Sequence, residues 1–228
     1  MSNGRHRLTV SVIVPCHNGE AYLAAALDSI FAQTRPADEV ILVDDGSTDA
    51  TVGIAAAYAS RLRYVAQSRQ GAGAARNAGI KLATGDCIGF LDADDLWSPL
   101  SLERRTALLE AEPALACVTG MMQQFSGDGA VRAAPVPTRL LGAMMVRRAV
   151  FARIGCFDTS GRLGEAFEWT ARLSDSGLPT AAVEHVVMLR RIHATNTGIT
   201  ARDRRNEYLY ALKATIDRRR TAGIGRAP

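Results

Sequence analysis

Carboxylates gather in two short runs, each of which follows an apolar segment of the chain. Asp92 and Asp94 come after the segment CIGFL, and Asp44 and Asp45 come after EVILV. Because alternate residues of an extended chain point the same way, Asp92 and Asp94 can face one ligand. Such hard oxygen donors suit Mg²⁺ or Mn²⁺, which usually keep some waters and share phosphate oxygens with a substrate. The acidic runs therefore favour a divalent metal or a hydrogen-bonded ligand.

Each acidic run also has a structural explanation. Asp92 and its neighbours could form a solvated turn, with Asp95 as the cap of the next helix. Gly46 could likewise make a turn before a helix that is capped by Ser47 or Thr48. A DxD triplet is common by itself, and capping alone explains the second run better than ligand binding does. Whether the two acidic runs bind a ligand or form turns and caps therefore depends on the sequence around them.

The first hundred residues alternate between strand and helix patterns. Apolar strands are predicted at residues 8–15, 39–43, 63–66 and 87–91, with a helix after each of the first three and Asn18 as the cap of the first helix. This alternation indicates a mostly parallel sheet with helices on both faces. In such a sheet, ligands bind beyond the carboxyl ends of the strands, where both acidic runs and residues 15–18 lie. The run GAGAAR at 71–76 lacks the third glycine of a dinucleotide-binding loop, so helix packing explains its small residues.

The second half of the chain is less regular. Further strands are predicted at residues 115–122, 140–146 and 183–192, and helices at 101–112, 165–176 and 208–220, with a loop at 126–138. Trp97 and Trp169 could line a ligand site or belong to the core, and the core is favoured for Trp97. No internal repeat or low-complexity linker interrupts the sequence, so we expect a single domain over residues 1–228.

Composition favours a near-neutral globule with a basic end. The 228 residues are 47% hydrophobic and 22% charged, which suits a packed core and argues against disorder. Of the net charge of +4, residues 202–226 contribute +5, so the rest of the chain sums to −1. The basic end lacks the zinc, aromatic and recognition-helix patterns of nucleic-acid-binding modules. We expect a solvated charged face and no nucleic-acid partner, with a peripheral contact to anionic lipid as the alternative.

Membrane segments and cysteines bear on the compartment. No stretch approaches the ~20 apolar residues that cross a bilayer, and the basic N-terminus is not followed by a small-residue cleavage site. Cys16, Cys87, Cys117 and Cys156 lie far apart, without a CxxC pair or metal-ligand spacing. Reduced thiols are typical of the cytosol, so we expect a cytoplasmic protein, with a membrane-peripheral one as the alternative.

The order and spacing of four segments closely resemble those of family 2 glycosyltransferases, which have the GT-A fold. The segments are VIVPCHNGEAYL, VDDGSTD, GAGAARNAGI and GDCIGFLDADD. The resemblance covers residues 9–97 and continues more weakly to about residue 197. It implies an α/β fold with a mostly parallel central sheet flanked by helices, with a nucleotide-binding half at about 1–97, an acceptor-binding half at about 98–200 and a basic helix at about 201–228. It also implies inverting transfer of a sugar from a nucleoside-diphosphate donor, UDP- or dTDP-linked, to an acceptor hydroxyl.

The resemblance assigns roles to individual residues. His17 would stack on the base, Asp45 would recognise it, and Arg76 would lie near the base and the phosphates. Asp94 would hold a divalent metal, Mn²⁺ or Mg²⁺, which offsets charge on the leaving diphosphate. The implied nucleotide-binding residues are Pro15, His17, Asn18, Glu20, Asp45, Arg76, Asp92 and Ala93, and the implied metal ligands are Asp94 and His193, with Arg191 as an alternative to His193 at the diphosphate. Alternatively, His17 is a loop histidine without a ligand, and His193 has a structural role.

The chain departs from the family where the resemblance implies a general base. The family commonly carries Asp at the position of Ala166, within the run GEAFEW at 164–169. An inverting transfer needs a carboxylate to take the acceptor proton, which alanine cannot do. Glu165 or Glu168, which lie one turn apart on a helix, could serve as the base, and Glu165 is the first choice. Alternatively, both are acids that the helix dipole favours in the first turn. The rival hypothesis is a catalytically weak or inactive nucleotide-sugar-binding protein of the same fold.

Overall fold

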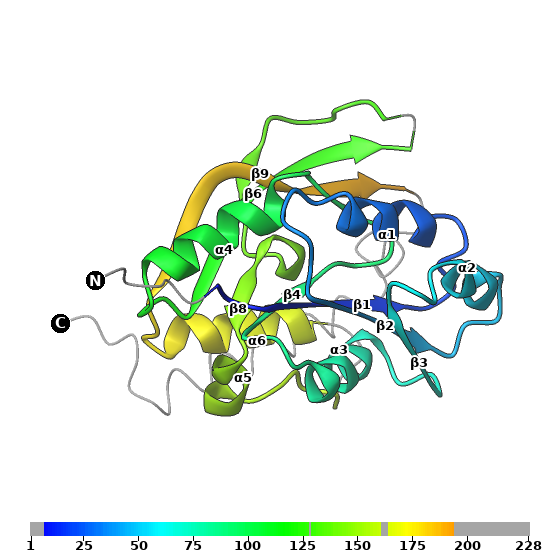
Figure 1. The fold of residues 1–228 in the computed structure, drawn as a ribbon, viewed down its shortest axis with the longest axis horizontal. Coiled ribbons are helices and arrows are strands. Elements are labelled where there is room, and N and C mark those ends of the chain that lie inside the picture. The colour runs from blue at the N-terminus through cyan, green and yellow to red at the C-terminus, as the bar shows by residue number, and fades with distance from the viewer. Residues whose placement is uncertain (1–6, 128, 161–163, 194–228) are drawn as a thin grey trace.

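The computed structural model describes residues 7–127, 129–160 and 164–193, and these residues form a nine-stranded sheet between two layers of helices. Along the sheet the strand order is β3-β2-β1-β4-β8-β6-β9-β5, and β7 pairs with β6 outside this path. Figure 1 shows β1 and β2 side by side, with α1 on one side of them and α3 on the other. The protein is therefore an α/β structure with helices on both faces of its sheet.

Parallel strands form the amino-terminal part of the sheet. They are β1 (Val10–Cys16), β2 (Glu39–Asp45), β3 (Arg63–Gln67) and β4 (Cys87–Phe90), and the helices α1 (Leu23–Phe31), α2 (Thr51–Ala57) and α3 (Ala72–Leu82) connect them in turn. Every residue of β1 and of β4 is buried, as expected for short apolar strands that are covered on both faces. The predicted alternation of strands and helices in this part of the chain is confirmed.

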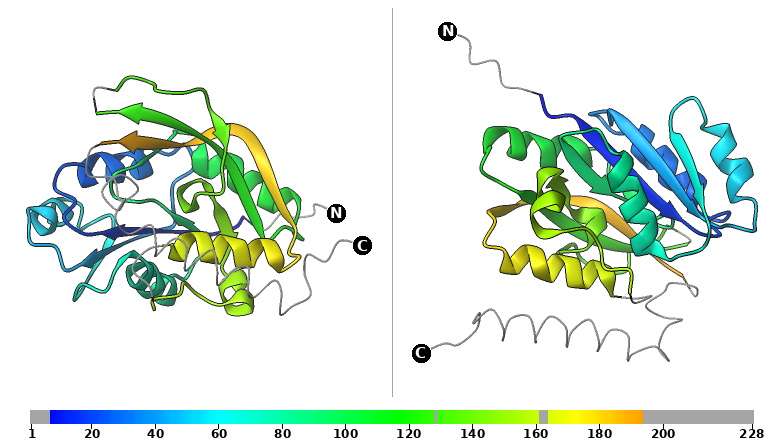
Figure 2. Two further views of the ribbon diagram at one scale, coloured as in Figure 1. Left: turned by 180° about the vertical axis from the view of Figure 1, so that it is seen from behind. Right: turned by 90° about the horizontal axis from the view of Figure 1, so that it is seen from below.

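The rest of the described chain extends the sheet with mixed strand directions. Its elements are β5 (Leu96–Trp97), α4 (Ser101–Ala111), β6 (Cys117–Ser126), β7 (Val136–Pro137), the 3-10 turn η1 (Leu141–Ala143), β8 (Met145–Arg147), α5 (Ala149–Ile154), α6 (Glu165–Asp175) and β9 (Thr180–Ile192). β8 runs antiparallel to β4 and β6, whereas β9 runs parallel to β6 and antiparallel to β5. Seen from behind, β6 and β9 lie side by side (Figure 2). The end of β9 thereby reaches the loop that follows β4.

Two features of the second half differ from the predicted elements. Residues 140–146 do not form one strand, because η1 occupies Leu141–Ala143 and the short β8 begins only at Met145. This run is apolar throughout, so its pattern does not distinguish a turn from a strand. Helix α5 occupies a segment for which no element is predicted. The predicted helix at 208–220 lies outside the described residues, and none of the described helices is long and apolar enough to cross a bilayer.

The predicted helix caps are wrong. Helices α1, α2 and α4 begin without a side-chain cap. The Asn18 N–H instead donates to Ser47 Oγ, and Asn18 Oδ1 accepts from the Thr48 N–H. Asp95 Oδ1 accepts from the Arg191 N–H. The polar groups that were expected to begin helices therefore join loops to one another, because loop backbone groups near the strand ends also need partners.

Two apolar clusters fill the space between the sheet and its helices. One buries the inner faces of α1, α2 and α4, and the other buries those of α3, α5 and α6. Trp97 and Trp169 belong to these clusters, and their indole N–H groups donate to the carbonyl oxygens of Gly142 and Gly155. Both tryptophans are core residues, so neither forms an exposed wall of an acceptor site.

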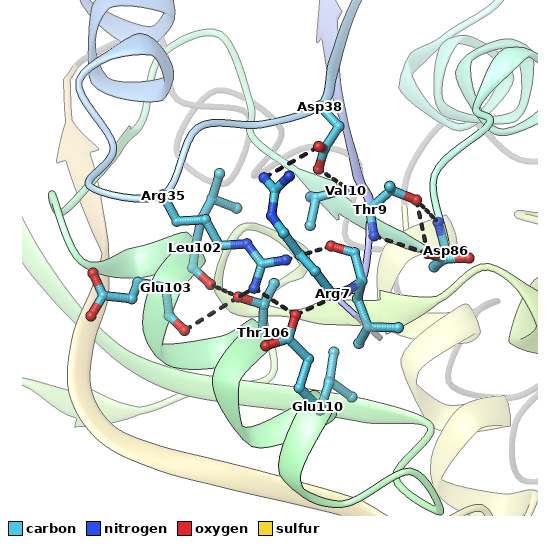
Figure 3. A network of polar contacts seen from close by, with 12 residues as sticks. Arg7, Thr9, Val10, Arg35, Asp38, Asp86, Leu102, Glu103, Thr106 and Glu110 are labelled. Atoms are coloured by element: carbon cyan, nitrogen blue, oxygen red, sulfur yellow. Dashed lines mark hydrogen bonds and ion pairs between the residues drawn. The ribbon is translucent and has the colours of Figure 1, made fainter. Parts of the chain in front are cut away.

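A polar network fixes the start of β1 and its surroundings (Figure 3). The carboxylates that build it come from three separate parts of the chain, at Asp38, Asp86 and Glu110. The backbone N–H groups of Thr9 and Val10 donate to two of them, each over 2.9 Å. Arg35 spans the third and Thr106 of α4. The amino ends of the strands are thus closed by structural contacts, and the candidate residues lie at the opposite ends.

Candidate active site

The loops that follow β1, β2 and β4 meet at one edge of the sheet. β1 lies between β2 and β4 and runs parallel to both, so the three carboxyl ends point the same way. His17, Asp45 and Asp92 stand at these ends. In open α/β sheets this edge is where ligands bind, because loops and helix N-termini converge there. The predicted site residues of the first hundred positions are therefore brought to one place.

Arg76 of α3 links two carboxylates of the candidate site. Its Nη1 donates to Glu165 Oε1 and its Nη2 to Asp92 Oδ1, each over 2.7 Å. The side chain of Arg76 is 6% exposed, whereas that of Asp92 is 47% exposed. Burial by itself would lower the pKa of Arg76, but the charges of Asp92 and Glu165 outweigh burial and raise it. A charged guanidinium thus bridges the carboxyl end of β4 to the start of α6.

Helix α3 approaches Glu165 closely because Gly73 has no side chain. A Cβ atom at Gly73 would lie 2.9 Å from Glu165 Cγ and 3.3 Å from the carbonyl oxygen of Asp158. The interpretation of this glycine as a packing position agrees with the contact, whereas Gly71 has a φ of 96° and no described neighbour within 4 Å of an added Cβ. Within the described part of the chain, Glu165 Oε2 has no hydrogen-bond partner. One oxygen of the Glu165 carboxylate is therefore held by Arg76, and the other can accept from a substrate.

Glu168 lies one turn further along α6 and pairs with Arg172. The Arg172 Nε lies 3.0 Å from the Glu168 carboxylate, and the same guanidinium donates to the carbonyl oxygens of Ile154 and Cys156. Ala166 packs against the apolar cluster of α3, α5 and α6. Of the two glutamates, Glu165 is the one that contacts the Arg76 guanidinium, whereas Glu168 pairs with Arg172, which fastens α6 to the end of α5.

Asp94 and His193 meet, although they come from opposite halves of the chain. Asp94 Oδ2 lies 3.1 Å from His193 Nε2, and the imidazole packs against the ring of Tyr22, with the centroids 4.7 Å apart. Burial, together with the charge of Asp92, raises the pKa of Asp94, and burial raises the pKa of Asp95 to about 8. Across the described ranges, no three or more His, Cys, Asp or Glu side chains are grouped to hold a metal. The pair still fits a hard divalent cation that takes its other ligands from phosphate and water.

Arg191 ties the end of β9 to the turn after β4. Its backbone N–H donates to Asp95 Oδ1 over 2.9 Å, and its Nε donates to the Asp94 carbonyl oxygen over 3.0 Å. Its guanidinium lies 4.8 Å from the ring centroid of Tyr22 and 4.6 Å from that of Phe125. Sequence reasoning missed Tyr22 and Phe125, because no local pattern links an aromatic of the β1 loop to one of β6. These contacts assemble the Asp94 side of the site from β6, β9 and the loops that follow β1 and β4.

The carboxylate of Asp45 organises the loop between β3 and α3. It accepts hydrogen bonds from Gln67 Nε2 and from the N–H groups of Gln70 and Gly71, over 2.7–2.8 Å. His17 Nδ1 lies 3.0 Å from the Asp45 carbonyl oxygen. Because a carbonyl oxygen only accepts, Nδ1 carries the proton, and Nε2 of a neutral ring is left as an acceptor. Contact of either side chain with a base stays a prediction.

Asn18 and Glu20 hold the loop after β1 against the loop after β2. Their hydrogen-bond partners are Ser47, Thr48, Asp49 and Ala50. Asn18 has a φ of 51°, a left-handed conformation that asparagine tolerates. Pro15 is buried in β1, and Ala93 lies 3.7 Å from where a Cβ at Gly19 would be. These four residues shape the loops around the candidate site, and their direct contact with a nucleotide stays a prediction.

Residues 11–159, more than half of the chain, match the sequence model of Glycosyl transferase family 2. The chain belongs to this family. An uncharacterized glycosyltransferase of Rickettsia prowazekii is 28% identical over 221 residues, which cover 87% of this chain and 69% of that protein. EpsJ of Bacillus subtilis is 43% identical over 100 residues, which cover 42% of this chain and 29% of EpsJ. The sequence resemblance to family 2 glycosyltransferases is thereby confirmed.

Solved structures of other proteins share the fold of this family 2 chain. The mannosyltransferase PcManGT from Pyrobaculum calidifontis, in complex with GDP-Man and Mn²⁺, matches with a TM-score of 0.74 and 22% identity over 98% of this chain and 66% of that chain. S. aureus TarS in complex with UDP-GlcNAc matches with a TM-score of 0.71 and 22% identity over 83% of this chain and 60% of that chain. This chain thus spans less than two thirds of EpsJ and TarS. The predicted α/β GT-A fold, a sheet of mostly parallel strands flanked by helices, is confirmed.

Proposed function

We propose that this family 2 glycosyltransferase transfers a sugar from a nucleoside-diphosphate donor to an acceptor hydroxyl with inversion. The observation that carries the proposal is the cluster at the carboxyl ends of the strands, in which Arg76 joins Asp92 to Glu165. The pair of Asp94 and His193 adjoins this cluster through the turn after β4. A cation beside several carboxylates suits a donor that carries both a diphosphate and hydroxyl groups. PcManGT and TarS, which share the fold, are described with GDP-Man and with UDP-GlcNAc.

In this proposal the nucleotide lies across the ends of β1, β2 and β4. His17 and Asp45 contact the base, with His17 Nε2 as an acceptor because Nδ1 donates to the Asp45 carbonyl. The charged guanidinium of Arg76 would lie near the base and the phosphates of the donor. The proposed nucleotide site also contains Pro15, Asn18, Glu20, Asp92 and Ala93. UDP and dTDP are the proposed nucleotides, and GDP is the alternative.

Asp94 and His193 are the proposed ligands of Mn²⁺ or Mg²⁺. One carboxylate and one imidazole, 3.1 Å apart, leave the remaining positions to phosphate oxygens and water. When bound, the metal would offset the negative charge that builds on the leaving nucleoside diphosphate. The part played by the chain is to fix both ligands, since Arg191 donates to the Asp94 carbonyl and Tyr22 packs against the imidazole.

Glu165 is the proposed general base. Its Oε2 would take the proton of the acceptor hydroxyl while the acceptor oxygen bonds to the anomeric carbon of the sugar. The bond from that carbon to the diphosphate breaks, and the nucleoside diphosphate leaves with the bonding electrons. Attack from the side opposite to the leaving group inverts the anomeric configuration. The hydrogen bond from Arg76 to Glu165 Oε1 would orient the carboxylate for this step.

A second candidate is a family 2 protein that binds nucleotide sugars with little or no turnover. The observation that favours it is that Glu165 is already paired with Arg76, while Ala166 stands at the position of the family's usual acid. The two candidates share the nucleotide site and differ in the rate of transfer. An Ala166→Asp variant distinguishes them, because a carboxylate at 166 should create turnover only in a protein that lacks a base.

Nucleotide binding and sugar transfer test the proposal. The purified protein would be screened by thermal shift with UDP, dTDP and GDP, with and without Mn²⁺, and assayed for nucleoside diphosphate released from the matching sugar donors. We expect stabilisation by one of the nucleotides with Mn²⁺ and release from its donor. Stabilisation without release, with release restored in Ala166→Asp, favours the second candidate. No stabilisation by any nucleotide overturns both.

The remaining expectations concern the surroundings of the enzyme. We propose a single domain over residues 1–228 with its acceptor site at about 98–200, in a cytoplasmic or membrane-peripheral protein. The basic segment at 201–228 is the proposed contact with anionic lipid, because it contains residues 202–226, which contribute a net charge of +5. Sedimentation with anionic and with neutral vesicles at low and high salt tests it. Binding to the anionic vesicles that weakens with salt is expected, and no binding at low salt removes the membrane contact.

A further inference from the structure

We propose that Asn77 is a positioning residue, which docks the segment before α6 on helix α3 and thereby holds the Glu165 carboxylate in place. The inference rests on the proposed function, in which Glu165 takes the acceptor proton. Asn77 follows Arg76 in the segment GAGAARNAGI, and the motif by itself gives this asparagine no role. Its contacts in the structure lead away from the nucleotide side of α3 and toward α6.

Asn77 and Phe157 form a reciprocal pair of hydrogen bonds. Asn77 Nδ2 donates to the Phe157 carbonyl oxygen over 2.8 Å, and the Phe157 N–H donates to Asn77 Oδ1 over 2.9 Å. Phe157 is 4% exposed, so both of its backbone groups need partners within the protein. A carboxamide supplies a donor and an acceptor at fixed spacing, whereas a carboxylate supplies acceptors only. An aspartate at 77 would therefore leave the Phe157 carbonyl oxygen facing another acceptor.

The ring of Phe157 connects this hydrogen-bonded pair to the site. Its centroid lies 5.5 Å from that of Trp169, and the Arg76 guanidinium lies 5.8 Å from it. Trp169 is one turn beyond Glu165 on α6, so the two side chains move together with the start of that helix. Fixing Phe157 consequently restrains the start of the helix that carries Glu165, whereas Arg76 keeps its own ion pair with Asp92.

Gly73 provides a second contact on the same face of α3. It lies one turn before Asn77, and the space beside it is taken by Glu165 Cγ and by the carbonyl oxygen of Asp158. One helix face thus holds residues 157 and 158 as well as the side chain of Glu165. Within the described ranges, no hydrogen bond joins Asn77 to Glu165, so Asn77 acts on the carboxylate only through the segment that it holds.

The variant Asn77→Asp removes the donor with little change of shape. Its matched control is Gln33→Glu, because Gln33 is another buried amide held by backbone groups. Gln33 Nε2 donates to the carbonyl oxygens of Ser29 and Ser98 over 2.9 and 2.7 Å, and Gln33 Oε1 accepts from the Leu102 N–H over 2.9 Å. Gln33 follows the end of α1, which covers the face of the sheet opposite to α3 and Arg76 (Figure 1). Both variants should lower the thermal midpoint. If lost stability alone lowered kcat, both variants would therefore show the same fall in kcat.

Kinetics then separate positioning from general stability. We expect Asn77→Asp to lower kcat by about tenfold to a hundredfold, since small displacements of a reacting group have effects of this size. The dissociation constant of the nucleoside diphosphate with Mn²⁺, measured by calorimetry, should stay within about threefold of the wild-type value. Gln33→Glu should keep kcat at the same stability loss. A fall in kcat for Asn77→Asp that is no larger than that of Gln33→Glu overturns the inference.

Hydrogen exchange distinguishes failure of this inference from failure of the proposed function. In Asn77→Asp, the Phe157 amide and the first turn of α6 should exchange faster, while β1 keeps its protection. Unchanged exchange at both places overturns the inference, whether or not the protein transfers sugar. If wild-type protein turns over no donor, the proposed function fails and the exchange result alone decides. If Asn77→Asp does not fold, the same measurements are made on Asn77→Ser, because that variant loses the amide without burying a charge.

Discussion

Asp94 Oδ2 lies 3.1 Å from His193 Nε2, although 99 positions of sequence separate the two residues. Strands β8 and β6 stand between β4, which leads to Asp94, and β9, which leads to His193. The two residues meet because the short β5, just after Asp94, crosses to pair with β9 at Leu96 and Leu189. The two-residue strand β5 thus joins the first hundred residues of the chain to β9 beside the proposed metal ligands.

His193→Gln should raise the Mn²⁺ concentration that gives half-maximal transfer. The variant removes one of the two protein ligands and leaves Asp94, so we expect an increase of about 10- to 100-fold. A titration of transfer with Mn²⁺ at saturating donor measures it. The control is His185→Gln, which replaces an exposed histidine of the same strand and should leave the Mn²⁺ dependence unchanged. An unchanged Mn²⁺ dependence in His193→Gln would leave that imidazole with a structural role only.

Glu165→Gln should lower kcat much more than it weakens nucleotide binding. If Glu165 is the general base, the loss is about 10²- to 10⁴-fold, while Asp92 still pairs with Arg76 and keeps the donor site charged. Glu168→Gln removes the negative charge from the ion pair with Arg172 and should chiefly lower the thermal midpoint. Rapid-quench transfer assays and calorimetry with the nucleoside diphosphate measure the two effects. Transfer at the parental rate in Glu165→Gln would remove Glu165 from the role of base.

The parallel strands and their connecting helices could be predicted from the sequence because their signals are local. Strands β1, β2 and β4 each contain a short apolar run, and α1 carries its own buried face at Leu23, Leu27 and Ile30. The carboxyl ends of parallel strands share one edge, so the meeting of Asp92 with the other early site residues follows from topology. Periodicity therefore predicted the elements, and the parallel order predicted where Asp92 lies.

The contacts that complete the site could not be predicted in the same way. Arg76 and Glu165 are 89 positions apart, and the fit of Glu165 against Gly73 depends on how α6 packs on α3. Nothing near Tyr22 in the sequence indicates that its ring will lie beside Arg191. Helix caps failed for a related reason, because a loop N–H can satisfy the same polar side chain as a helix start. Tertiary packing decided each of these contacts.

Cys156 should be the single thiol that reacts quickly in the native protein. It is exposed, whereas Cys16, Cys87 and Cys117 are buried. Burial raises the pKa of Cys16 and Cys117 to about 12 and that of Cys87 to about 11, so these thiols keep their protons near neutral pH and are poor nucleophiles. Mass spectrometry after a maleimide pulse should find one label on native protein, at Cys156, and labels on the other thiols only after unfolding. Native Cys156→Ser should stay unlabelled, and a second fast label would show that a core strand opens.

Gly79 and Gly53 should respond to alanine in opposite directions, although both lie inside helices. A Cβ at Gly79 would lie 2.5 Å from Ile13 Cγ2 in the buried core, so Gly79→Ala should push α3 away from β1 and cost about 1–3 kcal/mol of unfolding free energy. Apart from the backbone of its own helix, no described atom lies within 4 Å of a Cβ at Gly53. Gly53→Ala should therefore raise the free energy of unfolding by about 0.5–1 kcal/mol. Urea unfolding measures both. Shifts in the same direction would contradict the close contact of α3 with β1, and because α3 carries Arg76, Gly79→Ala should also weaken nucleotide binding.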